Sequence, residues 1–306
     1  MRVLVTGGAG FIGSNLANTL SADGHEVVVL DDLSLGVPSN LVNAVELVDG
    51  SVCDAGTVSK SMRGVESVFH LAAKSSLTMI IDDPVLGEEV NVGGFLRVLE
   101  AAREEGVERV VYASTSSIYS GIEPPHSEDM DVTPRTLYEQ NLFAREQIAS
   151  IYTATRDIEA VGMRFFSVYG SNEWHKKKYA NLVSQFIWSM LSDERPVIYG
   201  DGSQTRDFVH VSDVCRALIL ASRSEGAAGG VFNVCTGKSY SLNQLVNIIN
   251  DEIDASIEPR YVENPLKMYV DHTLGDPRKA REGLGFESTI SLREGVSMVV
   301  RDQEKA

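Results

Sequence analysis

Short apolar runs alternate with helical patterns along the first 170 residues of the chain. Six of these runs are four to eight residues long, and such nearly continuous hydrophobicity is typical of parallel strands covered on both faces. After the first run, Ile12, Leu16 and Leu20 follow the i, i+4 spacing of a helix with one apolar face. Repeated alternation of strands and helices predicts an α/β fold, a Rossmann-like doubly wound parallel sheet. The predicted strands cover residues 2–6, 26–30, 45–48, 67–71, 109–113 and 159–166.

The elements become shorter in the C-terminal part of the chain. Residues 197–199 and 231–234 are predicted to be short strands. Ser241 and Ser291 each stand three residues before a glutamine or glutamate, which is the spacing of a capping box that opens a helix. We therefore expect a Rossmann domain over residues 1–170 and a smaller lobe formed mainly by residues 171–306, with some segments of the second part returning to the main sheet.

Composition excludes several classes of function. The 306 residues carry 27 basic and 43 acidic side chains, a net charge of −16, so a general nucleic-acid binder, which needs a positive surface, is not expected. No apolar run approaches the roughly 20 residues that span a bilayer. The first residues enter a predicted strand directly, so we expect no targeting segment and no membrane association. The three cysteines form no CxxC pair and the six histidines no HxxxH or HExxH spacing, which predicts reduced thiols, a cytoplasmic protein and no built-in metal site.

A glycine-rich turn joins the first predicted strand to the first predicted helix. Gly7, Gly10 and Gly13 stand where the chain must turn tightly, where backbone must approach a pyrophosphate and where a helix must pack on a strand. The free N–H groups of the following helix would face the phosphates. Asp31 closes the second predicted strand, where a carboxylate accepts hydrogen bonds from an adenosine ribose and repels a 2′-phosphate. This arrangement predicts a dinucleotide site that prefers NAD to NADP.

Further motifs follow this turn in a characteristic order. They are GGAGFIG from Gly7, DDLS from Asp31, HLAA from His70, Asn91, STSSIY from Ser114, Tyr138, GDGSQTRDFVHV from Gly200 and KAREGLGF from Lys279. With this set the chain resembles the extended short-chain dehydrogenase/reductase family, in particular its NAD-dependent nucleotide-sugar epimerases and dehydratases. The resemblance covers nearly the whole sequence, and it implies that the smaller lobe binds the substrate.

The resemblance also implies a role for individual residues. Tyr138 matches the catalytic tyrosine of the family and Thr115 its catalytic serine or threonine, and both would contact the substrate. The other implied substrate contacts are Ser167, Asn181, Leu182 and Arg206, the last of which would hold the nucleotide diphosphate. The implied NAD contacts are Gly7, Gly10, Phe11, Ile12, Gly13, Asp31, Asp32, Ser34, Leu71, Ala72, Ala73, Lys74, Asn91 and Tyr138.

One departure from the family pattern concerns the helix that carries Tyr138. Leu142 stands four residues after Tyr138, where the family has a lysine that binds the nicotinamide ribose and lowers the pKa of the tyrosine. Arg145, seven residues after Tyr138, or Lys74 is a candidate for a replacement cation. The ordinary interpretation of an arginine beside Glu146 is a surface position, so we predict that Arg145 is exposed. Ser167 also departs from the family, which has an asparagine there.

The residues after Thr115 narrow the choice of reaction. Related dehydratases have an aspartate and a glutamate there, and decarboxylases usually keep the glutamate, whereas this chain has Ser116 and Ser117. Epimerisation at C4 of a UDP-hexose, either UDP-glucose and UDP-galactose or the N-acetylated pair, is therefore the favoured function. The alternatives are a reductase, dehydratase or decarboxylase of the same family, or an impaired protein that binds NAD and a nucleotide sugar without turnover, because Leu142 replaces the lysine.

The resemblance implies an assembly as well. Relatives often dimerise by packing two helices from each subunit into a four-helix bundle. The corresponding helices here would cover residues 84–102 and 136–152, so we expect a homodimer.

Overall fold

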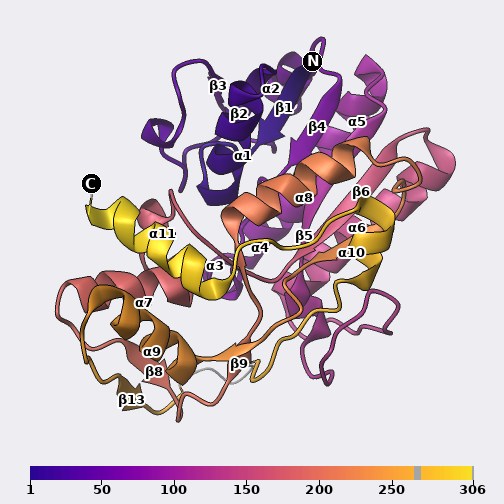
Figure 1. Cartoon of the computed structure of the whole chain (residues 1–306). Coiled ribbons are helices and arrows are strands. Elements are labelled where there is room, and N and C mark those ends of the chain that lie inside the picture. Colours follow the sequence, from indigo (N-terminus) through magenta and orange to yellow (C-terminus); the bar gives the residue numbers. More distant parts are fainter. Residues whose placement is uncertain (265–269, 305–306) are drawn as a thin grey trace.

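A seven-stranded parallel sheet forms the centre of the molecule (Figure 1). The computed structural model describes residues 1–264 and 270–304. Its strand order is β11-β6-β5-β4-β1-β2-β3, which confirms the predicted α/β fold with a doubly wound parallel sheet. The strands are β1 (Arg2–Thr6), β2 (Glu26–Asp31), β3 (Glu46–Asp49), β4 (Ser67–His70), β5 (Arg109–Thr115), β6 (Glu159–Phe165) and β11 (Val231–Val234).

Helices cover both faces of this sheet because alternate residues of each strand point to opposite sides. Val3 and Val5 of β1 pack into one apolar cluster with helices α1 (Phe11–Ala22) and α8 (Val211–Arg223). Leu4 lies in a second cluster on the other face. The helices of that face are α2 (Ala55–Met62), α5 (Phe95–Glu105) and α6 (Leu137–Thr155). Both faces are therefore buried, which explains the near-continuous apolar runs of the strands.

A smaller group of elements lies beyond the carboxyl ends of the strands (Figure 1). Its core forms between helices α7 (Leu182–Leu191), α9 (Leu242–Ile253) and α11 (Leu292–Glu304). In the described part of the chain, three two-stranded pairs complete it. They join β7 (Ser167–Tyr169) to β10 (Phe208–His210), β9 (Thr205–Arg206) to β12 (Tyr240–Ser241) and β8 (Val197–Tyr199) to β13 (Arg260–Val262).

The chain crosses between the sheet and this smaller group more than once. After β10 it returns along α8, which contacts β5 and β6, and β11 then pairs with β6 at the edge of the main sheet. Helix α10 (Arg278–Leu284) packs against β11 and α8 before α11 enters the smaller group. Among the described residues, no helix combines the length and hydrophobicity that a membrane crossing requires.

The helix expected over residues 84–102 is interrupted by a wider turn. It begins as α4 (Pro84–Glu88), continues as the π-helical segment η2 (Glu89–Gly94) and ends as α5. π-helical turns occur often at functional sites, and η2 contains Asn91. The remaining short helices are η1 (Pro38–Asn40), α3 (Leu77–Asp82), η3 (Ser116–Tyr119) and η4 (Trp174–Tyr179).

Candidate active site

A cleft of about 290 Å³ opens at the carboxyl ends of β1, β2, β4 and β5. The chain builds β2 and β3 on one side of β1 and then continues with β4, β5 and β6 on the other side. The connections therefore leave β1 and β4 in opposite directions, and a crevice remains between them. Such a switch point is the usual ligand site of an open parallel sheet.

The glycine-rich turn forms the floor of this cleft, and its packing requires glycine. Gly7 has φ +68°, and a Cβ there would lie 2.7 Å from the backbone nitrogen of Ala72. A Cβ on Gly13 would lie 2.1 Å from the carbonyl oxygen of Gly7. The turn thus leads directly into α1 with its backbone exposed to the cleft, which is the cradle that a pyrophosphate needs.

Asp31 lies at the end of β2 beside this turn and is 7% exposed. One carboxylate oxygen accepts the N–H of Ala9 at 2.9 Å, and the other accepts the N–H of Leu33 at 2.9 Å. Burial raises the pKa of Asp31, while these two hydrogen bonds oppose the change. Each carboxylate oxygen keeps a second lone pair for a ribose hydroxyl, so the position fits the adenosine half of NAD.

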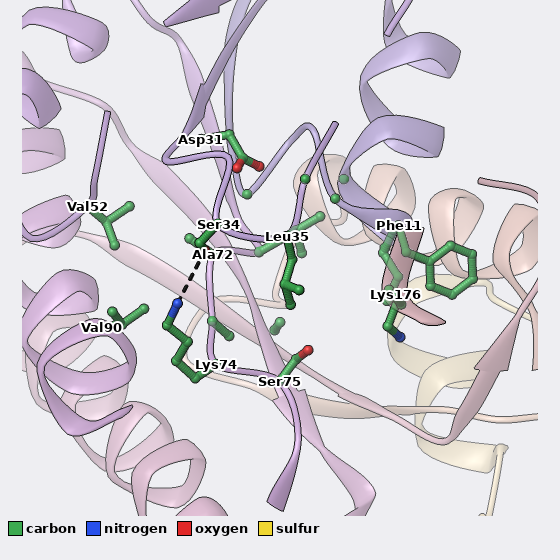
Figure 2. Close-up of a pocket in the computed structure, with 18 of the residues that line it drawn as sticks. Phe11, Asp31, Ser34, Leu35, Val52, Ala72, Lys74, Ser75, Val90 and Lys176 are labelled. Atoms are coloured by element: carbon green, nitrogen blue, oxygen red, sulfur yellow. Dashed lines mark hydrogen bonds between the residues drawn. The ribbon is translucent and has the colours of Figure 1, made fainter. Parts of the chain in front are cut away.

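Lys74 crosses this half of the cleft. Its Nζ donates to Ser34 Oγ at 3.2 Å, as Figure 2 shows, between Val52 and Val90 on one side and Leu35 on the other. The backbone of Lys74 is held by Asn91, whose Oδ1 accepts the Lys74 N–H at 2.8 Å and whose Nδ2 donates to the Lys74 carbonyl at 3.2 Å. Asn91 therefore supports the cleft wall from behind.

Tyr138 and Thr115 bring two hydroxyl groups together in the same cleft. Thr115 is the last residue of β5, and Tyr138 is the second residue of α6. Burial raises the pKa of Tyr138 above 10, whereas the neighbouring Thr115 hydroxyl and the positive charge of Arg145 act in the opposite direction. The pair places a phenol where it can exchange a proton with a hydroxyl group of a bound ligand.

The prediction that Arg145 is exposed is wrong. Its side chain is 0% exposed, because backbone carbonyls of Ala72, Ala113 and Asn91 replace water as its hydrogen-bond acceptors. Leu142 lines the cleft and brings no charge to it. Arg145 therefore lies behind the cleft wall, one turn further along α6.

A second buried arginine fixes α6 to the sheet. Arg164 of β6 forms an ion pair with Glu146 at 2.7 Å, and Glu146 also accepts the hydroxyl of Ser114 at 2.5 Å. Arg164 donates in addition to the Tyr119 hydroxyl at 2.6 Å, and burial raises the pKa of Tyr119 to about 12. This network holds the helix of Tyr138 against the strand of Thr115.

The cleft gathers most of the residues that the sequence indicated, but not all of them. Asn91 supports the wall rather than lining it. Four expected substrate contacts are not among the described residues that line the cleft. They lie on β7 (Ser167), at the start of α7 (Asn181, Leu182) and on β9 (Arg206). The expected residues that line it are Gly7, Gly10, Phe11, Ile12, Gly13, Asp31, Asp32, Ser34, Leu71, Ala72, Ala73, Lys74, Thr115 and Tyr138.

Several cleft residues were missed by sequence reasoning. Most are apolar or small and carry no chemical signal of their own, such as Val52 and Val90. Lys176 belongs to the run His175–Lys178, and a run of charges is usually a solvated surface. Its Nζ instead bonds Glu173 at 3.1 Å and lies 5.1 Å from the centre of the Phe11 ring. The missed residues are Leu30, Leu35, Gly36, Gly50, Val52, Ser75, Val90, Ala113, Ser114, Phe165, Phe166, Val168, His175 and Lys176.

Comparison with known proteins shows the family of the chain. Residues 3–235 match the model of the NAD dependent epimerase/dehydratase family. A UDP-glucose 4-epimerase of Mycolicibacterium smegmatis is 38% identical over 98% of this chain and 97% of that protein.

Solved structures agree over the whole chain. A UDP-glucose 4-epimerase of Thermotoga maritima, solved with UDP-glucose, has a TM-score of 0.95 and 32% identity, covering 100% of this chain and 99% of that chain. A UDP-glucose 4-epimerase of Thermus thermophilus, solved with NAD, has a TM-score of 0.90 and 31% identity, covering 100% of both chains. The motifs, the cleft and these relatives agree, and the chain belongs to the NAD-dependent epimerase/dehydratase family.

Proposed function

We propose that this protein is an NAD-dependent 4-epimerase of a UDP-hexose. The observation that carries the proposal is the pairing of Tyr138 and Thr115 inside a dinucleotide cleft. The names of the relatives supply the substrate class. Two features support NAD as the cofactor: the glycine-rich turn, which has no room for a Cβ at Gly7 or Gly13, and the carboxylate of Asp31.

The proposed mechanism assigns one task to each hydroxyl group. NAD held by the glycine-rich turn and Asp31 would supply reversible hydride transfer at C4 of the sugar. Tyr138 takes the proton of the C4 hydroxyl and later gives it back. Thr115 donates a hydrogen bond to the same sugar oxygen and stabilises the charge that develops there.

The residues next to Thr115 favour epimerisation over elimination. Ser116 and Ser117 open η3, and the Ser117 N–H donates to Thr115 Oγ at 3.1 Å. Neither side chain is a carboxylate that could remove or supply a proton at C5 or C6. Dehydration and decarboxylation are thus less well supported than proton transfer at C4.

The smaller group of elements is proposed to bind the nucleotide. In this division, residues 1–170 hold NAD, and residues 171–306 mainly hold the substrate. Arg206 would bind the diphosphate, and its Nη1 already donates to the carbonyls of Thr205 and Asp271. Ser167, Asn181 and Leu182 would complete the substrate contacts.

The reaction is tested by proton NMR of the protein with NAD and, in separate samples, UDP-glucose, UDP-N-acetylglucosamine and UDP-glucuronate. We expect a new anomeric signal from the C4 epimer of one sugar without net formation of NADH. Tyr138→Phe should lower the rate by about 100-fold or more. Tyr152→Phe is the matched control, because Tyr152 lies on the same helix and bonds Glu100 instead.

The same samples separate the alternatives. Loss of carbon dioxide from UDP-glucuronate would identify a decarboxylase, and stoichiometric consumption of reduced cofactor would identify a reductase. Leu142 in the cleft favours a second candidate, a protein that binds NAD and a nucleotide sugar without turnover. Binding of both ligands with no product at any pH would support that candidate and contradict the proposed function.

A homodimer is proposed from the exposed apolar side chains of neighbouring helices. Ile81 of α3 and Val85 of α4 are 67% and 74% exposed, and Leu137 and Ile151 of α6 are 58% and 59% exposed. These helices contact one another, and a second copy would remove these side chains from water.

A cytoplasmic location is also proposed, and it agrees with the three free cysteines.

The dimer is tested by light scattering after size exclusion. We expect the wild type to be a dimer and Ile81→Glu combined with Val85→Glu to be a monomer, since a buried unpaired carboxylate opposes association. Met298→Glu, at an exposed position of α11, is the control. A monomeric wild type, or a dimer that survives both changes, would contradict the proposal.

A further inference from the structure

Arg145 is a buried cation without an ion-pair partner among the described residues. Nη2 donates to the carbonyl of Ala72 at 2.9 Å, Nη1 to that of Ala113 at 3.3 Å and Nε to that of Asn91 at 2.5 Å. Its guanidinium group lies 5.8 Å from the centre of the Phe95 ring. The other buried arginine of the fold core, Arg164, is neutralised by Glu146. Burial of an unpaired charge is costly, so its retention calls for an explanation.

The three carbonyls belong to the segments that build the reaction centre. Ala72 and Ala113 line the cleft, and Ala113 lies two residues before Thr115 on β5. Asn91 holds the backbone of Lys74 with its side chain. Arg145 itself is on the helix of Tyr138, seven residues further along. Helical side chains point back toward the N-terminus, which directs the guanidinium group toward the turn that carries Tyr138.

The cations that line the cleft are engaged elsewhere. Lys74 bonds Ser34 in the half of the cleft beside Asp31 (Figure 2). Lys176 pairs with Glu173 beside Phe11. Leu142, one turn after Tyr138, is apolar. Arg145 is therefore the described cation best placed to act on the Tyr138 hydroxyl.

We infer that Arg145 is a positioning residue that acts through Tyr138: from behind the cleft wall it supplies the positive charge that favours the phenolate and holds together the segments of Tyr138 and Thr115. A planar guanidinium group suits this position because its fork of donors reaches three carbonyls at once. The inference rests on the proposed function, because it assigns the charge to the tyrosine that exchanges the proton.

The charged groups around the pair agree with this assignment. Burial raises the pKa of Tyr138; the charge of Arg145 acts against this increase, and the charge of Glu139 on the same helix adds to it. Burial lowers the pKa of Arg145 to about 10, so the group stays charged near neutral pH.

Among the described residues, the other titratable groups nearest to this position are neutral, exposed or paired, as Glu146 is with Arg164 of β6. From β4, His70 faces Arg145, and burial together with Arg145 keeps the pKa of His70 well below 6.5. From β5, Tyr112 is buried and its pKa is raised well above 10. The carboxylates of α3, α4 and η2 (Asp82, Glu88 and Glu89) are exposed.

The test compares Arg145→Gln with Arg145→Lys, because both variants lose the fork of donors and only the first loses the charge. The first readout is the pH dependence of kcat with the sugar that the wild type epimerises. We expect the rising limb of the profile to move to higher pH by about one unit in Arg145→Gln, with about a tenfold loss of kcat at pH 7. Arg145→Lys should keep the wild-type limb. Arg109→Gln, at the opposite end of β5, is the control for loss of an arginine.

The second readout does not depend on turnover. In protein labelled with ¹³C at Cζ of its ten tyrosines, the Tyr138 signal is identified by its absence in Tyr138→Phe. Its alkaline titration should occur about one pH unit later in Arg145→Gln than in the wild type. Equal titration of Tyr138 in the wild type and in Arg145→Gln would overturn the inference. Absence of turnover in the wild type would instead count against the proposed function and leave this titration as the deciding measurement.

A third variant decides the matter if Arg145→Gln does not fold. Leu142→Lys places an ammonium group one turn from Tyr138 while Arg145 is retained. If Arg145 already supplies the charge, this variant gains no rate at pH 7. A gain of about tenfold or more would show that the wild-type site lacks a cation, and the inference would be wrong.

Discussion

At the scale of single residues, Gly13 is the position where added atoms have the clearest consequence. A Cβ there would lie 2.1 Å from the carbonyl oxygen of Gly7 and 2.7 Å from Cα of Gly8. Both neighbours are backbone atoms and cannot rotate aside, so Gly13→Ala must displace the turn. We expect a loss of about 1–3 kcal/mol in the free energy of unfolding and at least about a tenfold loss of NAD affinity, since the displaced N–H groups no longer face the phosphates.

Calorimetric titration with NAD and chemical denaturation measure these two effects. Gly24→Ala is the control, because Gly24 has φ +82° and nothing within 4 Å of an added Cβ, at the opposite end of α1. That variant should lose stability through backbone strain and retain NAD affinity. Wild-type NAD affinity in Gly13→Ala would show that the close packing of the turn is not needed for binding.

The same scale shows which site residues a sequence can reveal. Gly7, Gly13 and Asp31 were predictable because their chemistry depends on a short strand–turn–helix unit. The burial of Arg145 was not predictable, because its acceptors come from three segments 32 to 73 residues away. A charged side chain is normally assigned to the surface, and only the assembled backbone shows that carbonyls replace its water.

At the scale of elements, the first turn of α6 connects stability with catalysis. Thr136 Oγ1 accepts the N–H of Glu139 at 3.2 Å, and the Glu139 side chain accepts the N–H of Thr136 at 3.2 Å. Tyr138 lies inside this capping box. Thr136→Ala should lower the free energy of unfolding by about 1 kcal/mol. It should also lower kcat several-fold, because the turn that orients the phenol becomes less ordered.

Ser241→Ala provides the matched control for this prediction. Ser241 forms the same capping box with Gln244 at the start of α9, in the smaller group of elements. Its loss should cost a similar free energy of unfolding and leave kcat unchanged. An equal fall of kcat in both variants would attribute the effect to general stability rather than to the position of Tyr138.

Element prediction succeeded where patterns are long and, apart from β8 (Val197–Tyr199), missed the short paired strands. The apolar runs of the main sheet predicted its strands to within one or two residues, because burial on both faces leaves a continuous signal. The strands β7, β9, β10, β12 and β13 contain two or three residues each. Such segments are too short for any periodicity, and their structure depends on a partner that is distant in the sequence. The π-helical turn within residues 84–102 likewise has no signature in the apolar spacing.

At the scale of the whole molecule, the order of strands and helices along the sequence did not reveal where each of them lies in the fold. Residues 231–234 were predicted to be a strand, but only the structure shows that β11 joins the outer edge of the main sheet beside β6. The return of α8 to the sheet closes one face over β5 and β6. The protein is thus built from two interleaved parts, and its stability depends on groups buried in both of them.

Three buried histidines make this stability depend on pH. His70, His126 and His210 are 0–1% exposed, and burial lowers the pKa of each. In the unfolded chain they take up protons near pH 6.5. Below that pH the unfolded state binds more protons than the folded state, so the free energy of unfolding falls as the pH falls. Asp31 and Asp207 act with the opposite sign, because burial raises their pKa.

His70→Asn isolates one of these contributions, since an amide can replace the contact of His70 Nδ1 with the Thr6 hydroxyl at 2.9 Å. Urea denaturation at pH 7.5 and pH 5.5 gives the free energy of unfolding of each protein. One pH unit below 6.5, a histidine that stays neutral in the folded state costs about 1.4 kcal/mol. Between the two pH values the wild type should therefore lose up to about 1.4 kcal/mol more than the variant, whatever the carboxylates contribute. Equal losses in the two proteins would mean that His70 titrates in the folded state. Its side chain would then not be buried beside Arg145, as the structure has it.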